Sequence, residues 1–386
     1  MTVYVRSVAS ALAREGITTD IFTRATGGAR RVVGLDEGVR VISIEAGPQS
    51  EVTKDRLPQF VDEYTAGIRA FGQGQRIGYD ALHSHYWQSG MAGVELASTW
   101  RIPLVHSHHT LGHVKNGARA SGDVIESVGR VRGEEMLAGA ADVQVASTSQ
   151  EWQQLLTLYR ASSDSVKIVH PGVDHDLFYP LDRDRARAHL GIGGGPVLLS
   201  VGRIQPLKGI DLAIRAVPVL ASKLTESPTL VIVGGASGPK GGEEEDKLKR
   251  LTQSLGVSDL VHFAGPQPHE LLATFYAAAD ALIVGSHSES FGLTALEAHA
   301  CGTPVIGTSV GGLPDVVDHG SSGFLLAERD HHVVAERVMQ IMEQRARYRS
   351  RAIERAARFS WKKTAASLLE LYECLAREDV SDACVC

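Results

Sequence analysis

The chain has 386 residues, which is too long for one ordinary hydrophobic core, so we expect two domains. Its 43% hydrophobic and 22% charged residues are typical of a globular protein, and a formal net charge of -6 argues against a general nucleic-acid-binding protein. Its few, clustered cysteines do not form a secreted disulfide framework, and no apolar run is long enough to span a bilayer. We therefore expect a cytoplasmic protein without a membrane span.

Short apolar runs alternate with helical patterns along almost the whole chain, which predicts parallel β-α units and an α/β fold. The strands expected in the first half are 17–22, 39–44, 81–85, 104–108, 143–146 and 166–169. Those expected in the second half are 197–201, 230–233, 260–263, 281–284, 304–307 and 323–326. Helices are expected between them, for example at 210–220, 243–255 and 270–279.

The start of the chain departs from this pattern. Residues 3–14 have the periodicity of an amphipathic helix, whereas a doubly wound domain normally opens with a buried strand. Either this domain is built differently, or the chain as written begins inside its first β-α unit. Because the remaining alternation is regular, we favour the second interpretation and expect the first strand of the N-terminal domain to be missing.

The domain boundary is predicted by a segment rich in Pro, Gly and Asp at residues 170–180, which has the composition of a hinge. We place an N-terminal domain at 1–170 and a C-terminal domain at 171–360. Charged helical patterns follow Asp330, with a break at Phe359-Ser360-Trp361. The pattern favours a last helix, 361–386, that packs back on the first domain.

The most informative segment is Ser286 to Glu297, which connects an expected strand to an expected helix at 293–300. Glu289 lies in the loop, and Glu297 is expected about two turns inside the helix. Backbone N–H groups at the start of a helix favour a phosphate, and here we expect them around Phe291, Gly292 and Leu293. Two carboxylates beside a phosphate site indicate a pocket in which one could reach a ribose diol and the other a sugar.

Two cations, Arg203 and Lys208, follow the expected strand 197–201 on one loop that Pro206 stiffens. Because ligands of open α/β sheets bind beyond the carboxyl ends of the strands, these cations could neutralise a departing diphosphate without a metal. The alternative is a solvated loop with a lysine at a helix start. The carboxylate pair in the segment 286–297 favours the functional interpretation.

Histidines gather in the first half. His109, just after the strand at 104–108, could bind a sugar hydroxyl or stabilise developing charge. A zinc site is the alternative, since the neighbouring histidines are His83, His85, His106, His108 and His113. Two pairs fall at period two on strands and no further ligand is spaced for a metal, so we favour core histidines at positions 83 and 106.

Basic residues of the first half suggest an anion site. Lys54 and Arg130, together with Tyr86 and Thr110, could hold a phosphorylated acceptor. Spacing alone favours ordinary surface charges for Lys54 and Arg130.

These motifs resemble a known family. The run from Gly202 to Lys208, the pair Glu289 and Glu297, and Gly311-Gly312-Leu313-Pro314 look like retaining glycosyltransferases of the GT-B fold, which use nucleotide sugars. More narrowly, the segments 22–25, 83–87, 109–111, 115–116 and 201–208 are similar to the D-inositol-3-phosphate glycosyltransferases. The resemblance runs from Met1 to about the last helix.

The resemblance implies a GT-B architecture, with two doubly wound Rossmann-like domains that face a cleft. It implies that N-acetylglucosamine moves from UDP-N-acetylglucosamine to 1D-myo-inositol 3-phosphate, as in mycothiol biosynthesis. The partners implied are thus a small-molecule donor and acceptor, with a homodimer and no nucleic acid. No cofactor is implied for the chemistry, although the family holds a structural magnesium ion.

The resemblance also assigns roles to matching residues. Arg203 and Lys208 would hold the UDP diphosphate, Glu289 the transferred sugar and Glu297 the ribose, with His109 beside the reacting sugar. Further donor contacts would come from Gln267, Phe291, Gly292 and Leu293. The acceptor would be held by Thr2, Lys54, Tyr86, Thr110 and Arg130. The magnesium positions would be Tyr276, Ala277, Ala279 and Thr303.

Departures from the family lie in the acceptor half. The family's first strand and its Gly-Gly loop have no counterpart before Met1, and Thr2 stands where the narrower group has Asn. Two alternatives therefore stay open. One is a related glycosyltransferase with another acceptor, of the sucrose-phosphate type or a lipid mannosyltransferase. The other is a truncated protein that binds a nucleotide sugar without catalysis.

Overall fold

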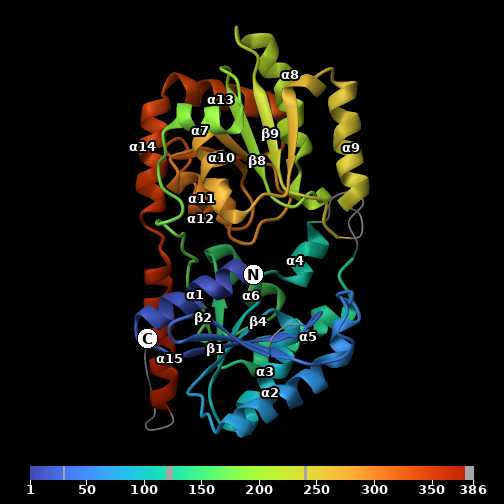
Figure 1. Cartoon of the computed structure of the whole chain (residues 1–386), viewed down its shortest axis with the longest axis vertical. Helices are drawn as coiled ribbons and strands as arrows, with labels where there is room; N and C mark the ends of the chain where they lie inside the picture. Colours follow the sequence, from blue (N-terminus) through green and yellow to red (C-terminus); the bar gives the residue numbers. More distant parts are fainter. Residues whose placement is uncertain (29–30, 119–124, 239–240, 379–386) are drawn as a thin grey trace. The chain divides into compact units, whose positions relative to one another are not determined.

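A computed structural model of the chain describes residues 1–28, 31–118, 125–238 and 241–378 (Figure 1). The chain divides into two compact units. The first unit comprises Met1–Asn116, Glu126–Gly172 and Trp361–Cys386. The second unit comprises Gly117–Ile125 and Val173–Ser360. No helix among the described residues combines the length and the apolar character that crossing a bilayer requires.

The first unit carries two sheets. In the first, β1 lies parallel to β3, and β2 pairs with β3 in the antiparallel direction. The second sheet is parallel throughout, in the order β4-β5-β6-β7. The strands are β1 (Thr19–Arg24), β2 (Val32–Asp36), β3 (Val39–Ile44), β4 (Leu82–His85), β5 (Leu104–Ser107), β6 (Val143–Ala146) and β7 (Val166–Ile168). The opening helix α1 (Thr2–Arg14) agrees with the periodicity of the sequence.

Strand β2 was not predicted from the sequence. Four of its five residues are exposed, so it lacks the alternation of apolar and polar residues that marks a half-buried strand. Glu37 and Gly38 alone separate it from β3, and Gly38 has a positive φ of 78°, as a tight hairpin turn requires.

The helices of the first unit are α2 (Val61–Gln75), α3 (Trp87–Trp100), α4 (Gly112–Gly117), α5 (Val128–Ala140), α6 (Ser149–Leu158) and α15 (Trp361–Glu378), with a 3-10 turn at Leu57–Phe60. Local polar residues start two of them. The Ser127 hydroxyl caps α5 by accepting a hydrogen bond from the Arg130 N–H at 3.2 Å. At the start of α6 the Thr148 hydroxyl accepts from the Glu151 N–H at 2.9 Å, and the Glu151 carboxylate accepts from the Ser147 N–H at 2.7 Å, an arrangement close to a capping box.

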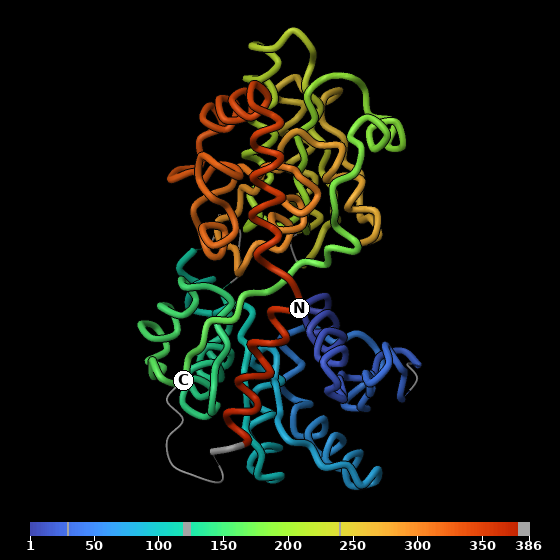
Figure 2. The backbone as a smooth tube through the Cα atoms, turned by 90° about the vertical axis from the view of Figure 1, so that its left-hand side faces the viewer, coloured from blue at the N-terminus to red at the C-terminus, as the bar shows by residue number. Residues whose placement is uncertain are grey.

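The last helix, α15, packs against the first helix although the two are far apart in the sequence (Figure 2). Trp361 at its start meets Tyr4 of α1 edge to face, with ring centroids 5.6 Å apart. Farther along α15, the Tyr372 hydroxyl lies 2.6 Å from Nδ1 of His83. The C-terminal helix therefore completes the core of the first unit.

The second unit is one sheet of six parallel strands in the order β10-β9-β8-β11-β12-β13. Its strands are β8 (Val197–Val201), β9 (Thr229–Val233), β10 (Val261–Gly265), β11 (Ala281–Val284), β12 (Val305–Thr308) and β13 (Gly323–Leu326). The strand order reverses between β8 and β11. In such sheets the switch point opens a crevice at the carboxyl ends of the strands, where ligands bind.

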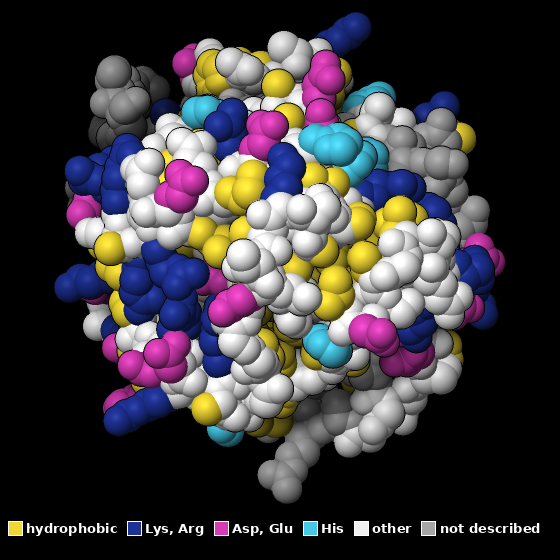
Figure 3. Space-filling view, turned by 90° about the horizontal axis from the view of Figure 1, so that it is seen from above, with side chains coloured by type: hydrophobic (Ala, Val, Ile, Leu, Met, Phe, Trp, Pro, Cys, Tyr) yellow, Lys and Arg dark blue, Asp and Glu magenta, His cyan; other side chains and the backbone are white. Residues whose placement is uncertain are grey.

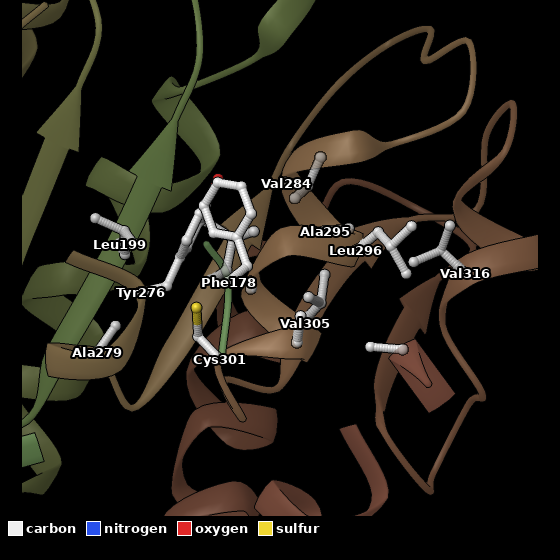
Figure 4. Packing of buried hydrophobic residues seen from close by; sticks show 14 of the residues in the cluster. Phe178, Leu199, Tyr276, Ala279, Val284, Ala295, Leu296, Cys301, Val305 and Val316 are labelled. Carbon is white, nitrogen blue, oxygen red and sulfur yellow. The ribbon is translucent and has the colours of Figure 1, made fainter. Parts of the chain in front are cut away.

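Helices cover both faces of this sheet (Figure 1). They are α7 (Arg183–Leu190), α8 (Asp211–Lys223), α9 (Gly241–Ser254), α10 (Leu272–Ala278), α11 (Leu293–Ala300), α12 (Leu313–Val316), α13 (His331–Glu343) and α14 (Arg345–Ala356). Alternate residues of a strand point their side chains to opposite faces of the sheet. Leu199 of β8 belongs to the cluster that also includes Tyr276 and Leu296, whereas Leu198 packs into the opposite cluster (Figure 4).

The surface of the molecule is mixed in charge on the face shown in Figure 3. Basic and acidic side chains lie among apolar ones there, which fits the modest formal net charge of -6.

Candidate functional site

A lysine and a glutamate meet at the switch point of the second unit. Lys208 lies in the 3-10 turn Pro206–Lys208 after β8, and Glu289 lies in the loop after β11. Lys208 Nζ donates to Glu289 Oε2 at 2.7 Å, and the Ser286 hydroxyl donates to the same oxygen at 3.2 Å. Both ionic side chains are partly exposed, so a ligand that enters the crevice can reach them.

A pocket surrounds this ion pair. Its walls come from the ends of β8 and β11 and from the start of α11, and its lining residues are Ser200, Val201, Gly202, Lys208, Ile210, Ile283, Val284, Gly285, Ser286, Glu289 and Thr294. A hollow at the carboxyl edge of a parallel sheet, with one cation and one anion inside it, suits a polar ligand that carries a negative group.

A close backbone approach holds the lysine loop in place. Gly209 has φ +56°, and a Cβ atom built on it would lie 2.1 Å from the carbonyl oxygen of Gly285. The N–H of His287 also donates to the carbonyl of Leu207 at 2.8 Å. Only glycine allows the loops after β8 and β11 to lie this close, which fixes Lys208 beside Glu289.

A second close approach holds the glutamate loop. Gly311, in the loop after β12, has φ +56°, and a Cβ atom there would lie 1.4 Å from the carbonyl oxygen of Glu289. The loop that carries the Gly-Gly-Leu-Pro motif therefore packs directly against the backbone of Glu289 and limits its movement.

The start of α11 closes the site on one side. The residues Phe291, Gly292 and Leu293 lead into this eight-residue helix, and Gly292 at its N-cap has φ +97°. The first N–H groups of an α-helix have no partner within the helix, and its dipole favours a negative group there.

Two further residues assigned to the donor lie at the same edge of the sheet. Arg203 follows β8 and is exposed, and it forms no ion pair with any other residue that the structure describes. Gln267 follows β10, where its side-chain amide donates to the carbonyl of Ala264 at 2.7 Å. Arg203 is therefore free to turn toward an anion, whereas Gln267 also ties down its own loop.

Glu297 lies nearer the start of α11 than expected from the sequence. It is the fifth residue of α11 and lies about one turn inside the helix, so the expected depth of two turns is wrong. Tyr276 Oη donates to Glu297 Oε2 at 2.8 Å, and His269 Nε2 lies 3.1 Å from Oε1. The carboxylate raises the pKa of His269 above its ordinary value, first through their hydrogen bond.

The four residues assigned to magnesium converge at the end of α10. Tyr276, Ala277, Ala279 and Thr303 are all buried, and the Thr303 hydroxyl donates to the Tyr276 carbonyl at 2.5 Å. Carbonyl oxygens at a helix end and a hydroxyl are oxygen ligands, which magnesium prefers, so the residues fit the ion in chemistry. In the described part of the chain, no group of three or more His, Cys, Asp or Glu side chains could hold a metal ion.

In the first unit the structure brings together three of the residues assigned to the acceptor. Arg130 of α5 donates from Nη2 to the carbonyl oxygen and to the hydroxyl of Thr110, at 2.9 Å in each case. Its guanidinium carbon lies 5.0 Å from the centre of the Tyr86 ring, which is a cation–π contact. A cation held among a hydroxyl and a ring at the strand ends can bind a phosphate group.

Two carboxylates already surround this arginine. Arg130 Nε donates to Glu134 at 2.7 Å, and Nη1 lies 2.9 Å from Glu126. Lys115 also forms an ion pair with Glu126. Burial would raise the pKa of Glu126, but the hydrogen bond from Lys115 and the charge of Arg130 together lower it. Glu126 thus bridges two cations in the way a bound phosphate would.

His109 lies at the end of the same sheet. The backbone φ angles of His109 and Tyr86 are both positive, at 60° and 73°. Such backbone strain in non-glycine residues is common at functional sites. His109 Nε2 is 3.0 Å from Nδ1 of His85, and the ring meets Tyr4 edge to face at 5.0 Å. Burial and the neighbouring His85 lower the pKa of His109 well below its usual value, so the ring is neutral near pH 7.

The other residues assigned to the acceptor lie at the margin of this cluster. Thr2 is the first residue of α1 and is exposed, two positions before Tyr4. Lys54 is exposed as well, and its carbonyl accepts a hydrogen bond from Gln88 at the start of α3. The structure thus places Thr2 on the helix whose Tyr4 meets His109, and Lys54 beside the start of α3, where Tyr86 is the N-cap.

Several residues that shape these sites received no role in the sequence analysis, although Lys115 and Ser286 lie in segments that it singled out. Glu126, Glu134 and Lys115 around Arg130, and His269 and Ser286 in the second unit, received no role from their spacing. The signal that could have found Glu134 is its position four residues after Arg130 on one helix, which is ion-pair spacing. Glu126 has the same spacing on the other side of Arg130, and Ser286 lies three residues before Glu289. The contacts of Lys115 with Glu126 and of His269 with Glu297 span 11 and 28 residues and join different segments, so their spacing gives no signal.

Comparisons with known proteins agree with this geometry. Residues 182–359 match the model of the family described as glycosyl transferases group 1, and residues 1–172 match that of the glycosyl transferase 4-like domain. The chain is 44% identical to the D-inositol 3-phosphate glycosyltransferase of Mycolicibacterium smegmatis, over 96% of this chain and 85% of that protein. It is 42% identical to the protein of the same name from Frankia alni, over 96% and 93% of the two chains.

Solved structures show the same fold. Sucrose-phosphate synthase from Thermosynechococcus elongatus superimposes with a TM-score of 0.87 at 30% identity, over 97% of this chain and 92% of the other. HepE from Anabaena, solved with UDP and glucose, superimposes with a TM-score of 0.77 at 19% identity, over 97% and 95% of the chains. Two Rossmann-like domains of the GT-B type are thus common to these proteins and to this chain.

Proposed function

We propose a donor, an acceptor and a stereochemical course for this chain, which belongs to the glycosyl transferases group 1 family and is a glycosyltransferase. The donor is a UDP-sugar, with N-acetylglucosamine as the transferred sugar. The acceptor is 1D-myo-inositol 3-phosphate, as in mycothiol biosynthesis, and the anomeric configuration of the sugar is retained.

The observation that carries this proposal is the meeting of Lys208, Glu289 and the start of α11 at the switch point of the second unit. A diphosphate at the helix start would accept hydrogen bonds from the first N–H groups of α11 and from Lys208 and Arg203. Its arrival would compete with Glu289 for Lys208, which would release the Glu289 carboxylate to the hydroxyl groups of the donor sugar.

The chemistry follows from this placement. An acceptor hydroxyl attacks the anomeric carbon on the face from which UDP departs, and the bond between that carbon and the diphosphate oxygen breaks. The departing diphosphate takes the proton of the attacking hydroxyl. Lys208, Arg203 and the α11 N–H groups stabilise the negative charge that grows on the leaving group, which lowers the barrier most in the transition state.

The acceptor proposal rests on the names of the relatives and on the cluster around Arg130. A phosphate would bind Arg130, the Thr110 hydroxyl and the Tyr86 ring edge, and Lys115 would add a second charge. Glu126 now bridges Lys115 and Arg130, so acceptor binding requires this carboxylate to move aside. His109 is neutral and lies close to the strand ends, so its ring would form a hydrogen bond with the reacting sugar, either as donor or as acceptor.

A structural magnesium ion would be held at the end of α10 by the carbonyl oxygens of Tyr276, Ala277 and Ala279 and by Thr303. It would bind the end of α10 to the loop after α11 and takes no part in the transfer. From the resemblance to the family we also propose a homodimer and a cytoplasmic location. Native mass spectrometry of the full chain tests the dimer.

Product analysis tests the function directly. The full chain is incubated with UDP-N-acetylglucosamine, UDP-glucose, ADP-glucose or GDP-mannose, each with 1D-myo-inositol 3-phosphate, and the products are identified by mass spectrometry. We expect the pseudodisaccharide phosphate from UDP-N-acetylglucosamine, with the α configuration of the donor retained in its NMR spectrum. A β-configured product would refute retention, and no product with any donor would refute catalysis.

A second candidate acceptor is fructose 6-phosphate. The likeness to sucrose-phosphate synthase, at 30% identity and a TM-score of 0.87, supports its inclusion. The same assay with fructose 6-phosphate in place of inositol phosphate separates the two acceptors, because both present a phosphate to the Arg130 cluster but differ in the mass of the product.

A further inference from the structure

Glu297 is held by a hydrogen bond at each of its oxygens. Tyr276 Oη donates to Oε2 at 2.8 Å, and His269 Nε2 lies 3.1 Å from Oε1. The three residues come from three elements: Tyr276 from α10, Glu297 from α11, and His269 from the 3-10 turn His269–Leu271. A carboxylate held at both ends has a fixed plane.

The two hydrogen bonds from Tyr276 and His269 leave the Glu297 carboxylate able to accept further hydrogen bonds. An ionised carboxylate has about two acceptor positions on each oxygen. Tyr276 takes one position on Oε2, and His269 takes one on Oε1, so one position stays free on each oxygen. Two free acceptors on adjacent oxygens match the two hydroxyl groups of a cis-diol such as that of a ribose.

The Tyr276 hydroxyl is itself rigidly placed. Tyr276 has no exposed surface, and its ring lies beside that of Phe178 with centroids 5.9 Å apart, while Cys301 points toward the pair (Figure 4). The Tyr276 hydroxyl lies 2.8 Å from Glu297 Oε2 and donates to that carboxylate oxygen. A buried donor cannot turn to water when the ligand arrives.

His269 is also supported. Its ring meets Phe178 edge to face at 5.1 Å, and its side chain is about one third exposed. Its pKa is raised first by the hydrogen bond to Glu297 and further by the charges of Glu297, Glu270 and Asp174, although burial opposes this. The charged form, with Nε2 as a donor, is therefore favoured beside the carboxylate.

We propose that Tyr276 and His269 are positioning residues that aim the free acceptor positions of Glu297 at the ribose diol of the donor, and that they thereby set the preference of this site for ribonucleotides over 2′-deoxyribonucleotides. The proposal rests on the proposed nucleotide-sugar function. It adds two side chains to the donor site, and both act through Glu297.

Calorimetric titration of the full chain with UDP and with 2′-deoxy-UDP tests this inference. The readout is the ratio of the two dissociation constants. The wild-type chain should bind UDP at least about tenfold more tightly, because a hydrogen bond to a charged group contributes roughly 1.5–3 kcal/mol. Tyr276→Phe should weaken UDP binding about tenfold and bring the ratio below about three, since the carboxylate loses its fixed plane.

The control is Tyr348→Phe, because Tyr348 in α14 is also fully buried but its hydroxyl has no hydrogen-bond partner among the described residues. This variant should keep the wild-type ratio. His269→Gln should lower the ratio in the same direction as Tyr276→Phe. His269 is partly exposed, so this second variant carries the test if Tyr276→Phe does not fold.

The outcomes separate this inference from the proposed function. If both variants weaken UDP and 2′-deoxy-UDP by the same factor, or leave both unchanged, the two residues do not aim Glu297 and the inference is overturned while the function stands. If the folded wild-type chain binds neither ligand, the proposed function fails and the inference fails with it. In the transfer reaction, the predicted effect of either variant is a raised donor KM with little change in kcat.

Discussion

The Lys208 side chain illustrates how one residue can serve the free and the liganded protein. In the chain without a ligand, Lys208 Nζ lies 2.7 Å from Glu289 Oε2, so the Glu289 carboxylate balances the charge of the lysine until an anion binds. The pair is partly exposed, and such pairs contribute little to stability. Its removal should therefore affect the reaction far more than the fold.

Lys208→Ala is expected to lower kcat/KM by about 100-fold to 1000-fold, the range for loss of one group that stabilises transition-state charge. The free energy of unfolding should change by less than about 1 kcal/mol. Steady-state assays of UDP release and urea denaturation measure the two effects. Lys249→Ala is the control, since Lys249 pairs with Glu245 on the surface of α9. Near wild-type activity in Lys208→Ala would remove the lysine from the mechanism.

Asp280, in contrast to Lys208, contributes to stability and not to ligand binding, because its side chain is buried. Its buried carboxylate accepts from the Val197 N–H at 2.8 Å and pairs with three arginines. The arginines are Arg183 at 3.3 Å, Arg187 at 2.8 Å and Arg345 at 2.7 Å. This one residue connects α7, α14 and the start of β8.

Asp280→Asn is expected to lower the free energy of unfolding by about 3 kcal/mol, because it leaves the buried Arg187 guanidinium without its counter-charge, whereas Arg183 and Arg345 are partly exposed to water. Urea denaturation measures this loss, with Asp184→Asn as the control at an exposed position of the same α7 helix. Equal stability of the two variants would show that the arginines find other partners.

At the scale of elements, the loops at the switch point depend on glycines that let backbones touch. Gly311→Ala combines a positive φ of 56° with a Cβ atom 1.4 Å from the Glu289 carbonyl oxygen, so the Glu289 loop has to shift. We expect donor affinity to fall at least about tenfold, and the protein to lose roughly 1–3 kcal/mol of stability. UDP titration and urea denaturation of the variant measure both.

The control for this loop is Gly242→Ala in α9, where an added Cβ atom meets nothing within 4 Å. This exchange should leave donor affinity unchanged. If Gly311→Ala also binds UDP as the wild-type chain does, the Gly-Gly-Leu-Pro loop does not support Glu289.

Elements were predictable where their pattern was strong and local. Strands such as Val39–Ile44, Val143–Ala146 and Ala281–Val284 begin and end where the apolar runs predicted, because each is a short buried run between polar turns. The meeting of Lys208 and Glu289 was also predictable, since carboxyl ends of parallel strands share an edge. The exposed strand β2 was not, because exposure removes the pattern.

Side-chain partners from distant segments were not predictable from one sequence. Tyr276 and His269 reach Glu297 across 21 and 28 residues, and Glu126 reaches Lys115 across 11. Their separations fit neither the helical nor the strand period, so only the packed structure brings them together. The helix begins at Leu293 as predicted, and the depth of Glu297 was misjudged because four residues make about one turn and not two.

At the scale of the whole molecule, the first unit holds five histidines, two fully buried and three partly buried, whose pKa values are lowered, chiefly by burial. They are His83, His85, His106, His108 and His109. The pKa of His85 falls to about 3. Below their ordinary pKa of about 6.5 the unfolded chain binds protons that the folded chain does not, so stability falls as the pH falls.

One buried acid opposes this trend. The pKa of Glu151 is raised to about 7 by burial, so its contribution to stability is greatest at low pH and is lost as the pH rises toward 7. Five histidines outweigh one glutamate. Each can contribute up to about 1.4 kcal/mol per pH unit below about pH 6.5.

The first unit should therefore become less stable between pH 7.5 and pH 5.5. All four tryptophans of the chain, Trp87, Trp100, Trp152 and Trp361, belong to this unit, so tryptophan fluorescence follows its unfolding alone. We expect the urea midpoint seen by fluorescence to decrease over this range. His332→Gln, at an exposed position of α13, should leave the pH dependence unchanged. A midpoint that does not move with pH would show that these histidines take up protons in the folded state.

The central claim is that the second unit binds the diphosphate of a sugar nucleotide with two side-chain cations and a helix start. Calorimetric titration of the folded full chain with UDP, beside Lys208→Ala, tests it most directly. The account predicts measurable UDP binding by the wild-type chain that weakens at least about tenfold in the variant. No affinity of the folded wild-type chain for UDP, ADP or GDP would contradict it.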